Sequence, residues 1–445
     1  MEMMFEHLDD SEEVHPGARE LAWTLRRADG IRARRRLALA IGSCCVLFAA
    51  SIGFFFARPS RHVSLSGAVF AFNLRKGPLP VGLPVPTTAL VDVQFVNPQD
   101  GVALALHGNS AFLASSSDGG DSWQVRNDRL PGNLESGSGS QIEFVGMTGY
   151  LWGARTAVGA PLWVTHNDGT TWHRAAIGPY VFDVSAIDLN VWALTSTCAA
   201  GESGARCTVG IEESIDGGNT WTEARPFNLT VEPEMIPLQP IELARITTTR
   251  AYVLTNIANL NESPSWQIQS TRDGGATWAS FPVPCAGAFG DGAEVAASST
   301  NDLWLMCGSQ ASAGIQSKEL YRSSDGGVIW TLTAATGLGT PPPATVLPNP
   351  LPLGGYVAPF SVGHRNLAVL SATTAWLYPF RGGLYKSTDG GQSWASIPAL
   401  SAAGFDSGGE GNVTFFSASQ GWICDYGIGL WHTSDGVTWS PLGVG

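Results

Sequence analysis

Seven short segments of the chain repeat the pattern Ser/Thr-x-Asp-x-Gly-x-Ser/Thr-Trp, with small departures. Aspartates repeated in this way raise two kinds of chemistry, calcium binding and acid catalysis. The glycine and hydroxyl residues favour a third role, a hairpin turn whose aspartate accepts its own backbone N–H groups while the tryptophan covers it. We therefore expect structural turns, called boxes below, at the following pairs: Asp118 and Trp123, Asn167 and Trp172, Asp216 and Trp221, Asp273 and Trp278, Asp325 and Trp330, Asp389 and Trp394, Asp435 and Trp439.

A second group of acidic residues lies in the long segments between the boxes. Two carboxylates that converge could act as acid and base in glycoside hydrolysis, or a cluster could bind a cation. The alternative is ordinary solvated loop charge, which we favour. The residues of this group are Glu202, Glu232, Glu234, Glu262, Asp291, Asp406 and Glu410.

The cysteines and the missing motifs limit the other chemistries. Cys198 pairs by spacing with Cys207, and Cys285 with Cys307, so each pair is expected to form a local disulfide outside the cytoplasm. Cys424 is left without an assigned partner. The chain has no HExxH, no GxSxG and no lysine after a phosphate-binding glycine loop. We therefore expect no cofactor, no metal and no catalytic residue.

The box tryptophans recur at steps of 45 to 64 residues, and each interval holds several short apolar runs. The second run of a unit often opens with a tryptophan, as the sequence suggests for Trp152, Trp192, Trp304, Trp376 and Trp422. Four short strands per unit are typical of a propeller blade. The sequence therefore predicts an all-β fold, a seven-bladed propeller of four-stranded antiparallel blades over residues 91–445.

The repeats resemble the Asp-box (bacterial neuraminidase) repeats of sialidases, sortilin-type receptors and the photosystem II stability/assembly-factor-like propellers. The unit here, with its "TxDGGxTW" turn, is most similar to the last group. This resemblance implies the propeller fold and says little about activity, because unrelated activities share the box. The arginine-bearing segment that a sialidase would need before its first box is absent from this sequence.

Strand order divides the predicted propeller into two faces. The turns between first and second strands and the boxes share one face, the box face, where segments are short. The long segments with the second group of acids fall on the opposite face, the long-loop face. Long loops on a rigid scaffold commonly carry binding sites, so the long-loop face is the predicted partner-binding face.

The N-terminal residues predict a membrane anchor. Residues 37–57 carry no charge over 21 positions and follow six arginines between positions 26 and 36. This favours a cytoplasmic tail at 1–36, a single transmembrane span at 37–57, a Pro/Gly-containing linker at 58–90 and the propeller outside the cell membrane. A cleaved signal peptide is the alternative.

The charge of the exported part bears on its partners. Residues 62–445 contain 16 basic and 30 acidic residues, which argues against a nucleic-acid partner. The predicted function is a membrane-anchored, non-catalytic binding or assembly scaffold for a protein or glycan partner. The alternative is an exo-acting glycoside hydrolase, sialidase-like, on the same fold.

The predicted topology can be tested with protease. Because the arginine-rich flank precedes the span, protease added to intact spheroplasts should digest residues 62–445 and spare the tail, as followed with antibodies to each end. Detection of a soluble form that begins near Arg58 would show instead that the segment is a cleaved signal peptide.

Overall fold

The structure is a computed structural model. It describes residues 72, 78–108, 110–127, 130–131, 140–153, 160–198, 207–222, 225–231, 241–257, 265–285, 292–310, 315–336, 351–352, 366–379, 382–402 and 411–443. The predicted tail, the predicted span 37–57 and most of the predicted linker lie outside these residues. Within the part of the chain described here, no helix combines the length and apolar character needed to cross a bilayer.

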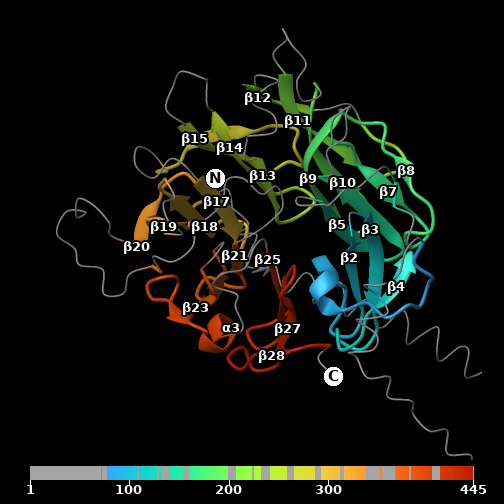
Figure 1. Cartoon of the computed structure of the whole chain (residues 1–445). Coiled ribbons are helices and arrows are strands. Elements are labelled where there is room, and N and C mark those ends of the chain that lie inside the picture. The colour runs from blue at the N-terminus through green and yellow to red at the C-terminus, as the bar shows by residue number, and fades with distance from the viewer. Residues whose placement is uncertain are drawn as a thin grey trace, which may run out of the picture.

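The described residues form seven four-stranded sheets arranged around a ring (Figure 1). Each sheet consists of four consecutive strands, and every neighbouring pair within a sheet is antiparallel. The first strands of neighbouring blades contact one another, so they are the innermost strands of the ring. The prediction of an all-β, seven-bladed propeller is confirmed.

The first four blades have the following strands. Blade 1 contains β1 (Leu90–Phe95), β2 (Gly101–His107), β3 (Ser110–Ser116) and β4 (Gln124–Asn127). Blade 2 contains β5 (Gln141–Val145), β6 (Thr148–Trp152), β7 (Trp163–Thr165) and β8 (His173–Arg174). Blade 3 contains β9 (Tyr180–Ile187), β10 (Asn190–Ser196), β11 (Cys207–Ser214) and β12 (Arg225–Val231). Blade 4 contains β13 (Ile241–Arg245), β14 (Ala251–Ile257), β15 (Ser265–Thr271) and β16 (Ala279–Pro282).

The remaining three blades complete the ring. Blade 5 contains β17 (Gly292–Ala297), β18 (Leu303–Gly308), β19 (Lys318–Ser323) and β20 (Thr331–Ala335). Blade 6 contains β21 (Leu367–Val369), β22 (Ala375–Leu377), β23 (Tyr385–Ser387) and β24 (Ala395–Ser396). Blade 7 contains β25 (Gly411–Phe415), β26 (Gly421–Asp425), β27 (Gly429–Thr433) and β28 (Ser440–Pro441). A short 3₁₀ helix η1 (Thr87–Ala89) precedes β1, and a short helix α3 (Pro398–Ala402) follows β24.

The hydrophobic core is divided among the interfaces between blades. Among the described residues, seven clusters of buried side chains occur, and each combines residues of two neighbouring blades. In the cluster between blades 2 and 3, for example, Tyr150 and Val164 pack with Val191. A four-stranded sheet alone would leave both of its apolar faces in water, so each blade depends on its neighbours for burial.

In each blade one residue near the start of the second strand pairs with the hydroxyl residue that opens the box, as Gly149 pairs with Thr165 in blade 2. In six blades the residue after it is aromatic. The aromatic residues that follow are Tyr150, Trp192, Tyr252, Trp304, Trp376 and Trp422. The expectation that Trp152 opens the strand of blade 2 is wrong. Trp152 ends β6, because the two-residue turn before β6 places Tyr150 at the aromatic position.

Blade 7 closes the ring on blade 1 through side chains and a few backbone contacts. The rings of Phe95 and Trp422 stack with their centres 4.2 Å apart. The Trp422 indole N–H donates to the carbonyl of Gly119 in the first box (3.0 Å), and the Gly427 N–H donates to the Thr88 carbonyl (3.0 Å). Residues more than 300 positions apart in the sequence therefore hold the ring together.

The end of the predicted linker packs along blade 1. The N–H groups of Gly82 and Val85 donate to the carbonyls of Val125 and Trp123, both at 2.8 Å. Further back, the carbonyl of Phe72 lies 2.8 Å from His107 Nε2, and the Phe72 ring packs against Phe112. His107 ends β2, so this contact lies at the long-loop face.

Both predicted disulfides are confirmed. Cys198 and Cys207 join the end of β10 to the start of β11, with their Cα atoms 5.4 Å apart. Cys285 and Cys307 join the segment after β16 to β18, with their Cα atoms 5.3 Å apart. Cys424 is a buried free thiol in the core between blades 7 and 1, and burial raises its pKa well above the ordinary value.

Ring closure can be tested at Trp422. Replacing Trp422 with Ala removes the stacked ring and the hydrogen bond to Gly119, so the free energy of unfolding should fall by about 3–5 kcal/mol. Trp422→Phe keeps an aromatic ring on Phe95 and should lose closer to ~1 kcal/mol, as expected for one hydrogen bond. Both losses can be measured by urea denaturation. Equal losses for the two variants would show that stacking is not what closes the ring.

Candidate functional site

The predicted loop acids lie outside the described residues. This holds for all seven candidates, Glu202, Glu232, Glu234, Glu262, Asp291, Asp406 and Glu410. Their convergence on one site is therefore untested, and the long-loop face stays a prediction from the sequence. The carboxylates that the structure does place belong to the strands and to the box face.

Each complete box uses both oxygens of its aspartate inside its own turn. In the fourth box the Thr271 hydroxyl (2.8 Å) and the Thr277 N–H (2.9 Å) donate to Asp273 Oδ1, and the Thr277 hydroxyl donates to Oδ2 (2.6 Å). The Trp278 indole N–H donates to the Gly275 carbonyl (3.1 Å). The same bonds recur around Asp118, Asp216 and Asp389, and the Asn167 amide takes the equivalent place in the second box.

Two boxes depart from the pattern and lose contacts. Ile329 replaces the second hydroxyl residue in the fifth box, so in the second half of that turn Asp325 Oδ1 accepts two N–H groups, those of Val328 and Ile329. The seventh box is one residue shorter, and Asp435 Oδ1 accepts the N–H groups of Val437 and Thr438. In the described structure the buried indole N–H groups of Trp330 and Trp439 have no hydrogen-bond acceptor.

The hydrogen bonds of the box keep its aspartate ionised. The Thr220 hydroxyl, the Thr220 N–H and the Ser214 hydroxyl lower the pKa of Asp216 to about 2. The Thr277 hydroxyl, the Thr277 N–H and the Thr271 hydroxyl do the same for Asp273, whose pKa is also about 2. A carboxylate with this pKa is not a proton donor near neutral pH, so these boxes are poor candidates for general acids.

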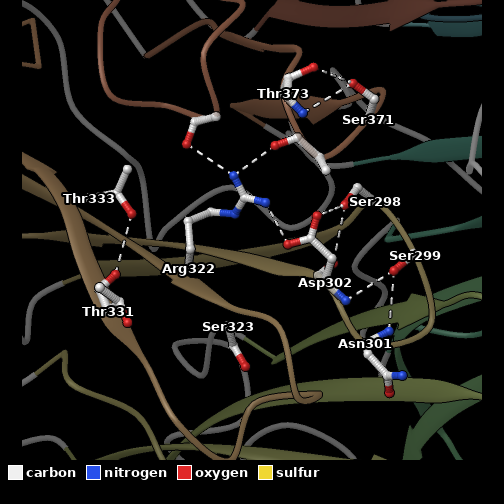
Figure 2. A network of polar contacts seen from close by, with 12 residues as sticks. Ser298, Ser299, Asn301, Asp302, Arg322, Ser323, Thr331, Thr333, Ser371 and Thr373 are labelled. Carbon is white, nitrogen blue, oxygen red and sulfur yellow. Dashed lines mark hydrogen bonds and ion pairs between the residues drawn. The ribbon is translucent and has the colours of Figure 1, made fainter.

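Every blade also donates a hydrogen bond to a turn of the next blade. Figure 2 shows one case, in which Arg322 of β19 reaches across to blade 6. Its guanidinium donates to the carbonyls of Ala372 (2.9 Å) and Gly390 (3.0 Å), and pairs with Asp302 of its own blade at 2.5 Å. Six such contacts end on a box glycine carbonyl: Asn127 to Gly169, Tyr150 to Gly217, Arg225 to Gly274, Arg322 to Gly390, Lys386 to Gly436 and Trp422 to Gly119.

The interface between blades 4 and 5 uses a variation of this contact. There the Arg250 Nε–H (2.9 Å) and the Tyr252 hydroxyl (2.5 Å) donate to the carbonyl of Thr300, in the turn beside the box. At this interface the carbonyl of Thr300 takes the place of the box-glycine carbonyl as the acceptor.

A second set of inter-blade contacts lies on the innermost strands. A carboxylate from the first strand of one blade accepts a backbone N–H from the first strand of the next blade, as Asp92 does from Ile142 (2.8 Å). Glu294 is 2% exposed and accepts the N–H groups of Asn366 (3.0 Å) and Leu367 (2.8 Å). The carboxylates of this set are Asp92, Glu143, Asp183, Glu242 and Glu294.

Sequence reasoning missed these five residues. Their signal is an acidic residue between two apolar ones, once per unit, as in Val91-Asp92-Val93 and Ile241-Glu242-Leu243. At the register position of Asp92, Asp183, Glu242 and Glu294, blade 7 has Asn412 and blade 6 has Asn366, whose carbonyl accepts the Tyr378 N–H, so the carboxylate repeat is incomplete there. Because an edge strand exposes unpaired N–H groups, these carboxylates satisfy an edge that faces the middle of the ring.

A buried lysine fixes one connection on the long-loop side. Lys318 opens β19 and is fully buried, and its ammonium donates to the carbonyls of Gln316 (3.0 Å) and Pro352 (3.1 Å). Burial lowers the pKa of Lys318 to about 7. Among the described residues, no group of three or more histidine, cysteine or acidic side chains could hold a metal ion.

Comparison with known families and structures agrees with the observed fold. The family model described as the DUF6242 beta propeller domain matches residues 89–346, which span the first five blades. The comparison with curated proteins gives no match.

Solved propellers resemble the chain at low identity. The structure of YCF48 bound to D1 peptide is 18% identical, with 81% of this chain and 98% of that chain covered and a TM-score of 0.50. YCF48 from Cyanidioschyzon merolae is 15% identical, with 81% and 99% covered and a TM-score of 0.49. A polysaccharide lyase, the PL25 ulvan lyase, is 10% identical, with 83% and 95% covered and a TM-score of 0.46. These likenesses concern the fold.

The ionised boxes predict a specific acid sensitivity. Since the folded-state pKa of Asp273 lies below its ordinary value of 3.8, its contribution to stability is complete above that value. It is lost as the pH falls from about 4 to about 2. Asp273→Asn, which copies the second box, should lower the unfolding free energy at pH 7 and flatten its fall between about pH 4 and pH 2.

The matched control is the reverse change in the second box. Asn167→Asp should make the decline steeper over the same pH range, as measured by urea denaturation at a series of pH values. If the unfolding free energy fell equally steeply with pH in both variants and in the parent chain, this would contradict the assigned role of the box carboxylates.

Proposed function

We propose that this chain, which belongs to the DUF6242 beta-propeller family, is a membrane-anchored scaffold outside the cell membrane that binds a protein or glycan partner without catalysing a reaction. Within that family we place it among Asp-box propellers of the photosystem II assembly-factor-like kind, on the strength of its box sequences.

The observation that carries this proposal is how the innermost carboxylates are used. Asp92, Glu143, Asp183, Glu242 and Glu294 each accept a backbone N–H of the following blade. Glycoside hydrolysis needs two carboxyl groups that face a substrate at roughly 5–9 Å from each other. Carboxylates held by backbone N–H groups of the neighbouring blade serve the assembly of the ring, which favours a binding role over catalysis.

The point where the predicted linker meets the propeller supports a membrane-anchored arrangement. Phe72 is 2% exposed, contacts His107 at the end of β2, and follows the predicted span 37–57 by fifteen residues. In this proposal the chain reaches the propeller at the long-loop face, and the box face points away from the membrane.

The class of partner is proposed from the comparison. The YCF48 propeller that is 18% identical to this chain has a peptide as its ligand. We propose that the long-loop face of this chain also binds a segment of another protein. The acidic loop residues are the proposed contacts.

The proposal predicts that loop charge affects binding while leaving stability unchanged. Glu232→Lys combined with Glu234→Lys should reduce recovery of the partner from detergent-solubilised membranes by at least about tenfold, a loss of about 1.4 kcal/mol. The melting temperature should stay within about 2 °C, because surface substitutions are usually nearly neutral. The matched control, Asp100→Lys with Asp121→Lys, reverses two charges on the box face and should leave recovery unchanged.

The same protein should be tested with a panel of chromogenic glycosides. The proposal expects no turnover above that of the protein-free control. Turnover that a single loop carboxylate substitution abolishes would favour the exo-acting glycoside hydrolase instead.

A further inference from the structure

The box face is fully described and has more acidic than basic side chains. The seven boxes and the seven turns between first and second strands contain eleven aspartates, two arginines and no lysine. Of the two arginines, Arg250 is buried against Tyr252, so Arg272 is the exposed one. The hydrogen bonds that lower the pKa values of the box aspartates keep them charged at neutral pH.

The same face exposes six aliphatic side chains. They come from the turns and boxes of blades 2, 3, 5 and 7 and are Met147 (60% exposed), Leu189 (56%), Ile215 (73%), Val328 (50%), Ile329 (67%) and Val437 (68%). Single exposed apolar residues are common on protein surfaces and need no explanation. Several that lie together form a patch, which marks an interaction site.

Three of these six residues lie on the two sides of the seam between blades 2 and 3. The Gly217 N–H donates to the Leu189 carbonyl (2.9 Å), and the Asp168 N–H donates to the Met147 carbonyl (2.9 Å). A Cβ atom at Gly217 would lie 3.2 Å from the Leu189 side chain and 3.8 Å from that of Thr148, which follows Met147. Ile215 stands two residues before Gly217. We call Met147, Leu189 and Ile215 the blade 2–3 patch.

The local backbone presents two of these side chains to solvent. Blades 2 and 3 have two-residue turns between their first and second strands, whereas the other five blades have five-residue turns. The first residue of each short turn, Gly146 or Asp188, has a positive φ (70° and 54°). Met147 and Leu189 follow at the tips of these hairpins, where folding buries less than half of each side chain.

We propose that the blade 2–3 patch is a docking site for a protein segment in which aliphatic residues alternate with lysine or arginine. The aliphatic residues of the segment would cover Leu189 and Ile215, and its cations would meet Asp188 and Asp216, each adjacent in sequence to a patch residue. This site is independent of the partner proposed for the long-loop face, since the two lie on opposite faces of the ring.

The charge of the box face selects this occupant over two others. The eleven aspartates outnumber the basic side chains that reach this face, which are Arg126, Arg225, Arg245, Arg250, Arg272, Arg322 and Lys386. Anionic lipid headgroups would therefore meet a surface of the same sign of charge. A second copy of the same face would bring like charges together, which costs several kcal/mol at an interface. A cationic segment gains from the same charges.

The test uses the full-length chain in phosphatidylcholine nanodiscs and a dye-labelled twelve-residue peptide of alternating lysine and leucine. Fluorescence anisotropy should show binding that weakens with added salt and exceeds binding to empty nanodiscs. Leu189→Ser with Ile215→Ser should weaken binding by at least about tenfold. The matched control, Ile329→Ser with Val437→Ser, removes two aliphatic residues of similar exposure elsewhere on the face and should change binding less than about twofold.

Two further peptides separate charge from apolar contact. A peptide of alternating lysine and serine should bind at least about tenfold more weakly than the lysine–leucine peptide. A peptide of alternating glutamate and leucine should bind more weakly by the same factor. Equal effects of the two double variants, or equal binding of the glutamate peptide, would overturn the proposal. Dimers that dissociate in the Leu189→Ser, Ile215→Ser variant, seen by sedimentation, would assign the patch to self-association instead.

Discussion

The contact between neighbouring blades is the interaction on which this molecule depends. Each of the seven hydrophobic clusters is shared by two blades. A single blade therefore has no core of its own, and stability arises only when blades pack face to face. The aromatic residues near the start of the second strands pack into these interfaces, as the stacked rings of Trp376 and Phe415 show.

Polar contacts set the register of these apolar interfaces. Toward the middle of the ring, Asp92 and its counterparts accept N–H groups of the next innermost strand. Toward the box face, donors such as Arg322 bind the carbonyls of the next box (Figure 2). Apolar packing alone would tolerate sliding of one sheet over another. In the five pairs of blades that have an innermost carboxylate, hydrogen bonds at both ends of the interface fix the two sheets in one position. The acidic residues of the fold thus serve mainly to position blades.

Much of the fold could be predicted because the box repeat combines a turn with a fixed distance to its tryptophan. That spacing indicates seven units, and the disulfides at Cys198–Cys207 and Cys285–Cys307 follow from short separations. Trp152 was misplaced because a period-two strand allows an aromatic residue at either end. The roles of Glu242 and Glu294 were missed because their partners are backbone groups some fifty to seventy residues away. The aliphatic tips at Met147 and Leu189 gave no repeat signal.

The closure of the ring between blades 1 and 7 has a consequence for biosynthesis. Leu90 and Phe95 emerge early, whereas Trp422 and Cys424, which pack with them, belong to the last blade to be translated. During vectorial synthesis the apolar side of blade 1 stays uncovered until almost the whole chain is present. A nascent chain that stops before blade 7 would expose the apolar face of blade 1. It would also expose the apolar face of its last complete blade. Premature termination near the C-terminus is therefore more harmful to this molecule than the small number of missing residues suggests.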